Sequence, residues 1–448
     1  MSTKKGGEGS NSLAIEYRLT ASLAPQETNP RTHSKAQIRK IAKSIKHFGW
    51  VNPIITAENG KLLCGHARLE AAKLLGLREV PTVCVTGMTE ADKRAYILAD
   101  NALAQKAGWD VGLLKSEFEF LLSPELNFDI DLTGFEMSEI DGIVFDAPSD
   151  TAAQEEVVSE PDPDAPVVSM VGDLWTIGQH KLFCGDARDP ESYAILLGDK
   201  KAELVITDPP YNVPIAGHVS GLGAITHREF AMASGEMTKE QFIGFLSAVM
   251  QQLVAFAISG SIHMLFMDWR HIGELLTAGE AHYAELKNLC VWAKTNGGMG
   301  TFYRSQHELV FVFKAGDAPH INNFGLGDKG RYRTNLWTYP GVNSFQKGRN
   351  DQLAAHPTCK PVALLVDAIL DCSNRNAIVL DVFAGSGSTL VAAERTGRRG
   401  FGIELDPTYV DYIVARLEKE TGLQAKLHDG RSFAEVAAER TSYAEAAE

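Results

Sequence analysis

The sequence lacks any long apolar run. No stretch approaches the roughly 20 consecutive apolar residues that a membrane-spanning helix requires, and the N-terminal residues are polar, without the apolar core of a signal peptide. We therefore expect no membrane association and a cytoplasmic location. The chain has 448 residues, of which 44% are hydrophobic, so it is long enough for two or three domains with buried cores.

Cysteine is scarce and irregularly spaced. The six cysteines include no C-x-x-C pair, which argues against a zinc site and against a disulfide framework. We expect no bound metal, and we interpret most of these residues as small buried hydrophobes. They are Cys64, Cys84, Cys184, Cys290, Cys359 and Cys372.

Positive charge is in deficit, since 43 Lys and Arg stand against 57 Asp and Glu for a net charge of −14. The distribution is uneven, however. Residues 145–167 hold seven acids and no base, which together with the prolines there predicts a linker. Further on, basic side chains cluster with few acids nearby, and such local patches set the field that a phosphate backbone would meet. They are Lys329, Arg331, Arg333, Lys347, Arg349 and Lys360.

The stretch Asp208-Pro209-Pro210-Tyr211 is central to the chain. The apolar residues 204–206 predict a short buried strand, which the two prolines end in an extended corner. A carboxylate and an aromatic ring are thus presented where open α/β sheets bind ligands. The carboxylate accepts hydrogen bonds from an amine and the ring offers a stacking face, so the corner suits an amino group on a flat base. The alternative is an ordinary turn capped by an Asp.

A second motif lies near the C-terminus. Residues 377–382 predict a buried strand that ends at Asp381 and runs into Phe383-Ala384-Gly385-Ser386-Gly387. A helix follows, and residues 400–403 predict the next strand, which ends in Glu404. Glycines let a backbone approach a ligand at a helix N-terminus, and an acid after the next strand can hold ribose hydroxyls. The loop lacks the full G-x-G-x-x-G that is typical of dinucleotide sites.

Together these motifs resemble the amino-group DNA methyltransferases in their circularly permuted beta arrangement. The Asp-Pro-Pro-Tyr corner comes first, then His356-Pro357-Thr358-Cys359-Lys360-Pro361, then the loop from Asp381 to Thr389, and the resemblance spans residues 168–422. It implies a Rossmann-like α/β domain that transfers a methyl group from S-adenosyl-L-methionine to N6 of adenine in double-stranded DNA. The implied catalytic residues are Asp208, Pro209, Pro210 and Tyr211, and the implied cofactor-binding residues are Asp186, His356, Lys360, Asp381, Phe383, Gly385, Ser386, Gly387 and Glu404.

Two alternatives remain within this resemblance. The same chemistry on N4 of cytosine is one, although family members acting there more often carry Ser in place of Asp208. The other is a ParB-like DNA-binding regulator with an inactive methylase, which would predict damage to the corner or to the cofactor loop. C5-cytosine enzymes need a Pro-Cys nucleophile, which the sequence lacks. Restriction–modification systems are the expected context, and a homodimer is compatible with the arrangement.

The N-terminal part resembles a ParB/sulfiredoxin-like domain. The resemblance rests on Asn29-Pro30-Arg31, on Gly65-His66-Ala67-Arg68 and on Val80-Pro81. It implies a small α+β domain in which Gly65, His66 and Arg68 hold the phosphates of a nucleotide. The second nucleotide motif of this family, E-N-x-x-R, appears as Asp100-Asn101-Ala102-Leu103-Ala104 and lacks its arginine. The alternative is a strand–turn–helix corner kept for packing.

We therefore expect a disordered tail (1–12), a ParB-like domain (13–122), a helical and acidic linker (123–167), a methyltransferase domain (168–425) and a C-terminal tail (426–448). In the methyltransferase domain, helices at 239–257 and 271–282 and strands at 261–267, 286–293 and 308–314 alternate as in a doubly wound parallel sheet. Two irregular inserts, at about 212–237 and 315–355, are expected to read DNA, with contacts from Arg331, Arg333, Lys347 and Arg349.

Overall fold

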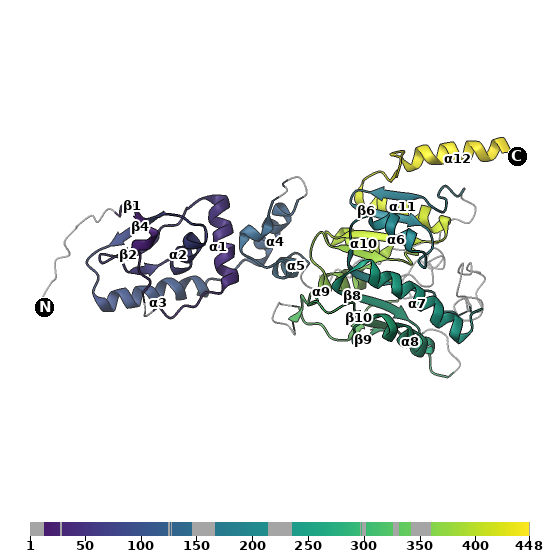
Figure 1. Ribbon diagram of the computed structural model, residues 1–448, viewed down its shortest axis with the longest axis horizontal. Helices are drawn as coiled ribbons and strands as arrows, with labels where there is room; N and C mark the ends of the chain where they lie inside the picture. Colours follow the sequence, from purple (N-terminus) through teal and green to yellow (C-terminus); the bar gives the residue numbers. More distant parts are fainter. Residues whose placement is uncertain are drawn as a thin grey trace. The chain divides into compact units, whose positions relative to one another are not determined.

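The computed structural model divides into two compact units, Met1–Asp146 and Ala147–Glu448, whose elements are labelled in Figure 1. It describes residues 13–26, 29–123, 126, 128–145, 166–213, 235–295, 297, 302–325, 331–341 and 360–447. The predicted N-terminal tail and the acidic stretch 146–165 lie outside these residues. No helix in the described parts is both long and apolar enough to cross a membrane.

The first unit is a small α+β fold. Its sheet has the order β1-β4-β2-β3, with β2 parallel to β4 and the other pairs antiparallel. The predicted helix after Ser34 is confirmed, because the Ser34 hydroxyl caps it by accepting from the Gln37 amide at 3.1 Å. The elements are β1 (Ile15–Leu19), η1 (Thr20–Ser22), α1 (Lys35–Phe48), β2 (Ile54–Ala57), β3 (Leu62–Cys64), α2 (His66–Leu74), β4 (Glu79–Val85) and α3 (Glu90–Lys106).

A separate helical cluster closes the first unit. It comprises α4 (Val111–Leu121), η3 (Ile130–Thr133) and α5 (Met137–Val144). The buried side chains of Phe118, Ile130 and Ile140 form its core. Part of the region expected to serve as a linker therefore has a hydrophobic core of its own.

The second unit is built on one mixed sheet of the order β11-β9-β10-β8-β7-β12-β13-β6-β5-β14. Its strands are β5 (Leu174–Ile177), β6 (His180–Cys184), β7 (Ala202–Thr207), β8 (Ala257–Met267), β9 (Glu285–Ala293), β10 (His307–Lys314), β11 (Leu336–Thr338), β12 (Ile378–Asp381), β13 (Arg399–Glu404) and β14 (Lys426–Leu427). Its helices are α6 (Pro190–Leu197), α7 (Lys239–Ala255), η4 (Trp269–His271), α8 (Ile272–His282), α9 (Val362–Cys372), α10 (Ser388–Arg395), α11 (Pro407–Thr421) and α12 (Phe433–Ala447).

The expected α/β fold and the expected elements of this sheet are present, but the sheet is mixed and not parallel throughout. Strand β10 runs antiparallel to both β8 and β9. Strand β9 ends at Ala293 and β10 begins at His307, and the two strands pair as an antiparallel hairpin. The hairpin is continued by two hydrogen bonds between Lys294 and Gln306, one from the Lys294 amide at 2.9 Å and one from the Gln306 side chain at 2.8 Å.

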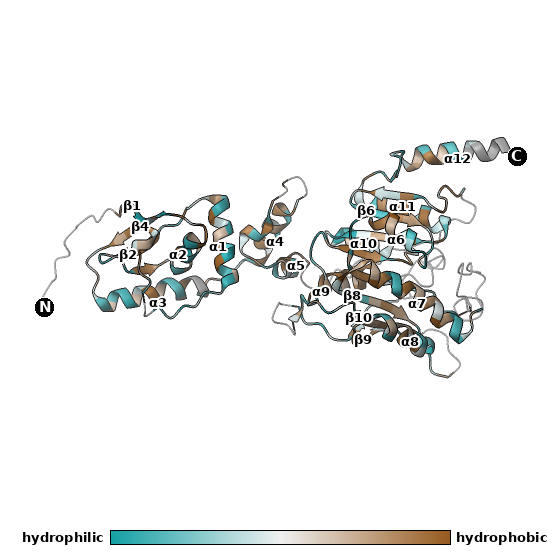
Figure 2. Cartoon of the chain, in the orientation of Figure 1, coloured by the Kyte–Doolittle hydropathy of each residue, from teal (hydrophilic) through white to brown (hydrophobic). Residues whose placement is uncertain are grey.

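Helices cover both faces of this sheet. Successive side chains of a strand point to opposite faces, and the apolar residues on each face are buried by helices. On β7, Val205 packs in one core with α6, α7 and α8, whereas Leu204 and Ile206 pack in the other with α9 and α10. Both cores are strongly apolar, as the brown colour of β8 and β10 in Figure 2 shows. The strands are thus buried on both sides, which holds their ends rigidly.

The chain changes direction between β7 and β12. From β7 it continues to β8 on one side, and from β12 it continues to β13 on the other, while β7 and β12 pair in parallel. Open α/β sheets bind their ligands at such a switch point, outside the carboxyl ends of the strands. Both predicted motifs begin there, one after β7 and the other after β12.

Candidate active site

The Asp-Pro-Pro-Tyr corner follows directly on β7. Strand β7 ends at Thr207, and after the corner Asn212 adopts a left-handed backbone with φ of 53°. The Asn212 side chain donates to the Met237 carbonyl at 2.9 Å and accepts from the Gly235 amide at 3.1 Å. These bonds close the base of the first insert, whose residues 214–234 lie outside the described part of the chain, and fix where the corner ends.

Five side chains meet at this corner, and we call them the catalytic cluster: Asp208, Tyr211, Lys294, Glu308 and Lys360. The Tyr211 hydroxyl lies 2.5 Å from Asp208 Oδ1 and 3.2 Å from Glu308 Oε2. The Lys360 ammonium pairs with Asp208 Oδ2 and lies 3.2 Å from Glu308 Oε2. Lys294 Nζ completes the cluster at 2.5 Å from Glu308 Oε1.

The two carboxylates of the cluster differ electrostatically. Burial raises the pKa of Asp208 and the Glu308 charge adds to this rise, while the Lys360 ammonium opposes it. Burial acts on Glu308 too, but Lys360 and Lys294 outweigh it and lower its pKa to about 2. Glu308 is therefore the firmly ionised acid, whereas the pKa of Asp208 is shifted upward.

Aromatic rings line the space around Lys360. Its Nζ lies 5.8 Å from the ring centre of Tyr211, 5.0 Å from that of Phe266 and 5.9 Å from that of Trp292. The side chain is only 6% exposed. A place with aromatic walls and carboxylate acceptors suits both an ammonium group and an amino group on a flat ring.

The structure places Lys360 in the catalytic cluster, and its assignment to the cofactor stays a prediction. The resemblance implied a cofactor contact, but the ammonium lies between Asp208 and Glu308. Glu308 was missed altogether. It opens the apolar strand β10, where a buried charge is costly unless it is paired, so an acid at the start of such a run was the signal that could have found it.

The loop after β12 is shaped for a ligand. Gly385 has φ of 52°, and a Cβ placed there would meet nothing closer than the Phe383 carbonyl oxygen at 3.8 Å, so one side of the loop is bare. On the other side, a Cβ at Gly387 would lie 2.9 Å from Ile413 of α11. The loop therefore packs against α11 at Gly387 and has open space at Gly385, which fits a bound cofactor.

Asp381 joins the loop to the catalytic corner. Its Oδ1 accepts from the Thr207 hydroxyl at 2.8 Å, and its Oδ2 accepts from the Thr389 hydroxyl at 2.6 Å. Burial raises its pKa to about 7. Because both oxygens are engaged, the contacts give Asp381 the task of fixing the loop beside β7.

Glu404 and Asp186 lie at the same edge of the sheet. Glu404 ends β13 and accepts from the Gly385 amide at 2.8 Å, and burial raises its pKa to about 7. The adjacent strand β6 leads into Asp186, where the ion pair with Arg188 outweighs burial and lowers the pKa of the carboxyl. Seven of the predicted cofactor residues thus lie at the ends of three neighbouring strands or after them: Asp186, Asp381, Phe383, Gly385, Ser386, Gly387 and Glu404. Of the other two, Lys360 lies in the catalytic cluster, and His356 lies outside the described residues.

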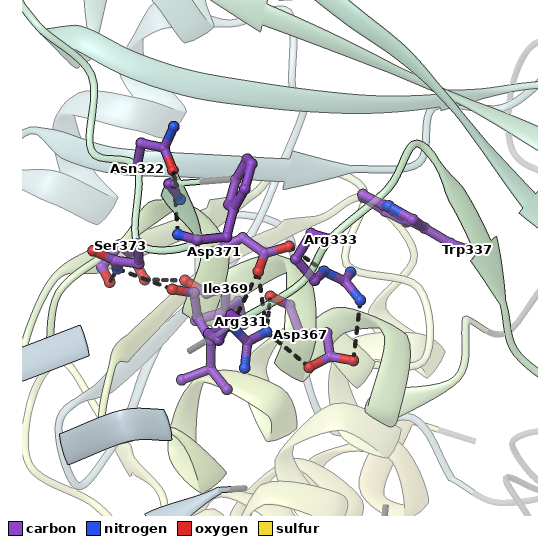
Figure 3. Close-up of polar contacts among 12 residues, drawn as sticks. Asn322, Arg331, Arg333, Trp337, Asp367, Ile369, Asp371 and Ser373 are labelled. Carbon is purple, nitrogen blue, oxygen red and sulfur yellow. Dashed lines mark hydrogen bonds and ion pairs between the residues drawn. The ribbon is translucent and has the colours of Figure 1, made fainter. Parts of the chain in front are cut away.

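Arg331 and Arg333 have partners that the sequence did not reveal. With Asp367, Asp371 and Tyr339 they form what we call the arginine cluster (Figure 3). Arg331 Nη2 lies 3.0 Å from Asp371 Oδ1 and 2.9 Å from Asp367 Oδ1, and Arg333 Nε lies 2.7 Å from Asp371 Oδ2. These contacts tie the insert to α9 and give both arginines a structural role. Lys347 and Arg349, which lie outside the described residues, are left as the proposed DNA contacts.

The first unit contains a cavity of about 450 Å³. The structure brings the predicted residues Gly65, His66 and Arg68 together in its lining, with Asn101. Gly65 has φ of 95°, and a Cβ there would press on Arg68 and Ile54 at 3.2 Å, so glycine is needed at this turn. Arg31 Nη1 donates to Asn101 Oδ1 at 2.7 Å.

Three family models match successive parts of the chain. The DNA methylase family model matches residues 202–415, the ParB N-terminal domain matches 7–102, and the ParB-methyltransferase HTH domain matches 112–170. The last match includes the helical cluster of α4 and α5.

Individual relatives match either the ParB part or the methylase part of the chain. The ParB-like nuclease domain-containing protein YnaK of Escherichia coli (strain K12) is 40% identical over 85 residues, which cover 19% of this chain and 98% of that protein. The type II methyltransferase M2.MboI of Moraxella bovis is 26% identical over 239 residues, 50% of this chain and 83% of that protein. The solved structure of the M1.HpyAVI–SAM complex has a TM-score of 0.39 and 21% identity, and the match covers 54% of this chain and 98% of that one.

The geometry of the second unit and these matches lead to one assignment. The corner, the bare glycine loop and the acid that ends β13 occur in the order and at the strand ends that the resemblance implied. Residues 202–415 belong to the N6/N4 DNA methylases, and a ParB N-terminal domain and a ParB-methyltransferase HTH domain precede them.

Proposed function

We propose that the chain transfers a methyl group from S-adenosyl-L-methionine to the exocyclic N6 of adenine in DNA, at a specific site. The observation that carries this proposal is the position of Asp208 and Tyr211. They follow β7 at the switch point, and Thr207 joins this corner to the cofactor loop through Asp381.

The residues of the corner perform the positioning. The target base must leave the helical stack to reach the site. Asp208 and the Pro209 carbonyl then accept the hydrogens of the amine, and Tyr211 stacks on the ring. Held in this way, the nitrogen lone pair points to where the methyl group is supplied, and catalysis consists largely of orientation and electrostatics.

The cofactor supplies a methyl group on a sulfonium, which is an electrophile that a neutral amine can attack. The residues proposed to hold it are Gly385, Ser386 and Gly387 at the loop, Glu404 for ribose hydroxyls, and Asp186, Phe383, His356 and Asp381 around them. Their support is the bare side of Gly385 and the orientation of Glu404 by the loop amide.

Adenine is favoured over cytosine by one residue. A carboxylate stands at position 208, where the resemblance associates Ser with N4-cytosine enzymes. The test is nucleoside mass spectrometry of unmethylated DNA incubated with the protein and labelled S-adenosyl-L-methionine. Label in N6-methyladenine that is absent with Asp208→Ala is expected. Label in N4-methylcytosine would overturn the assignment of adenine as the target base. Absence of label in DNA, with the cofactor still bound, would favour a regulatory protein.

For the first unit we propose nucleotide binding, supported by the cavity that Gly65, His66 and Arg68 line. Burial lowers the pKa of His66, so its ring is neutral there, and Arg68 supplies the positive charge that phosphates require. Equilibrium binding of labelled CTP and ATP tests this. Binding that Arg68→Ala abolishes is expected, and equal retention by wild type and variant would contradict the proposal.

A further inference from the structure

The catalytic cluster has two acceptors for one ammonium group. Lys360 pairs with Asp208 Oδ2 and also lies 3.2 Å from Glu308 Oε2. In the described structure its ammonium donates to the carboxylate that the target amine is proposed to use. An amine that arrives must therefore take the place of Lys360 at Asp208, and the displaced charge needs another partner because it is buried.

We propose that Glu308 is a positioning residue for the target amine: it holds the Lys360 ammonium when the exocyclic amine replaces Lys360 at Asp208. This inference rests on the proposed function and adds a role for a residue outside the methylase motifs.

Several features of Glu308 suit it to this role. Its other oxygen, Oε1, is fixed by Lys294 at 2.5 Å, so the acceptor is held in place on β10. Its side chain is 13% exposed and stays ionised, since the two ammonium groups hold its pKa at about 2. Lys360 reaches both carboxylates from its present position, so the exchange requires only a small shift of a flexible side chain.

The charge balance of the catalytic cluster supports the same role for Glu308. Asp208 and Glu308 balance Lys294 and Lys360, so the cluster is formally neutral. The variant Glu308→Gln leaves one carboxylate against two ammonium groups. Lys360 then has only Asp208 as a charged partner within the cluster, and the target amine must compete with a buried ion pair. In Glu308→Gln/Lys360→Met the balance is restored, because one carboxylate faces one ammonium group.

The experiment measures how much the amino group of the target base contributes to the affinity for DNA. The probes are duplexes that carry the methylated site, mapped beforehand, with either adenine or purine at the target position and an abasic site opposite it, so that the amino group differs but no base pair has to be broken. We expect wild type to bind the adenine duplex about tenfold more tightly, Glu308→Gln to bind both about equally, and the double variant to regain part of the preference. The control is Glu285→Gln, which removes an acid from an exposed pair with Lys287 on the same sheet and should behave as wild type.

A pH profile separates positioning from a purely structural effect. Glu308 raises the pKa of Asp208, so its removal lowers that pKa. The acid limb of kcat/KM should move to lower pH in Glu308→Gln, while kcat/KM at its plateau falls about 10- to 100-fold. Cofactor binding and the melting temperature, measured alongside, establish that the variant is folded.

Two results would overturn the proposal in distinguishable ways. If wild type methylates DNA and Glu308→Gln keeps both its preference for the amine and its acid limb, Glu308 is not a positioning residue, and the proposed function stands. If wild type transfers no methyl group to DNA, the proposed function fails and this inference fails with it.

Discussion

The catalytic cluster and the arginine cluster have the same composition but different surroundings. Each holds two carboxylates, two cationic side chains and one tyrosine hydroxyl. The catalytic cluster lies at the carboxyl end of β7 and uses lysines, whereas the arginine cluster lies on α9 and uses arginines. A lysine is a point charge that can exchange partners, while a guanidinium fixes two carboxylates in one geometry.

The difference shows why charge alone does not identify a binding site. Both clusters are buried ion-pair networks, and burial perturbs pKa values in each. Only the catalytic cluster combines a switch point, an aromatic lining and an acceptor whose partner can be exchanged. We therefore expect substitutions in the catalytic cluster to lower mainly the rate of methyl transfer. Substitutions in the arginine cluster should lower mainly the stability of the fold.

The largest effect is expected for Asp208→Asn. The amide keeps the size of the side chain but loses the negative charge that faces the amine, so the single-turnover rate of methyl transfer should fall by about a thousandfold. Lys360 retains Glu308 as a partner, and the Asp208 side chain is 21% exposed against 4% for Asp371, so the melting temperature should fall less than in Asp371→Asn. A variant that retains a tenth of the wild-type rate would contradict the role given to Asp208.

The opposite pattern is expected for Asp371→Asn. Asp371 is 3% exposed and pairs with both arginines, so its loss leaves two buried guanidinium groups with a single carboxylate, Asp367. Breaking such a buried pair costs about 3–5 kcal/mol of unfolding free energy. Chemical denaturation measures this cost. A change below 1 kcal/mol, about the scale of an exposed pair, would show that the arginine cluster does not secure α9.

Glu404 should couple cofactor binding to pH. Its pKa of about 7 in the free protein must fall when ribose hydroxyls donate to the ionised carboxylate. Binding then releases a proton below pH 7, so the affinity should rise by about tenfold per pH unit from roughly pH 5 to 7 and level off above it. Calorimetry in buffers of different ionisation enthalpy measures the release.

Two variants sharpen this test of Glu404. Glu404→Gln should abolish the proton release. Asp381→Asn should retain it, because both oxygens of Asp381 are engaged by hydroxyl groups of the protein itself. Equal release by wild type and Glu404→Gln would assign the proton to another group.

The smallest effect, near zero, is expected for DNA binding by Arg331→Gln. A residue that contacts a phosphate contributes a slope of about −0.9 to the dependence of log K on log salt. Arg331 is paired with two carboxylates, so the slope should equal that of wild type although the melting temperature falls. A slope reduced by about one unit would show instead that Arg331 contacts a phosphate of the DNA.

The sequence predicted the residues whose role depends on local order in the chain. Two prolines after an apolar run place Asp208 at the end of a strand, and two glycines before a helix place a ligand loop, whatever the rest of the fold. The roles of Arg331 and Lys360 depend instead on partners that are 40 and 152 residues away. Charge counting does not reveal such partners, so the sequence alone predicts DNA contacts for Arg331 and Arg333 and a cofactor contact for Lys360.

Elements without a clear apolar pattern were also hard to predict. Strand β1 is largely exposed and exists because it pairs with β4, so its own sequence carries little signal. The direction of β10 depends on its hairpin with β9, which the helix–strand alternation of the neighbouring segments obscured.

The most direct test compares the two clusters in one measurement. Methyl transfer to DNA is recorded per folded molecule for wild type, Asp208→Asn and Asp371→Asn, at a temperature below all three melting points. We expect wild-type transfer from Asp371→Asn, despite its lower stability, and almost none from Asp208→Asn, despite its intact fold. Loss of transfer in Asp371→Asn together with retention in Asp208→Asn would contradict the assignment of the active site to the corner after β7.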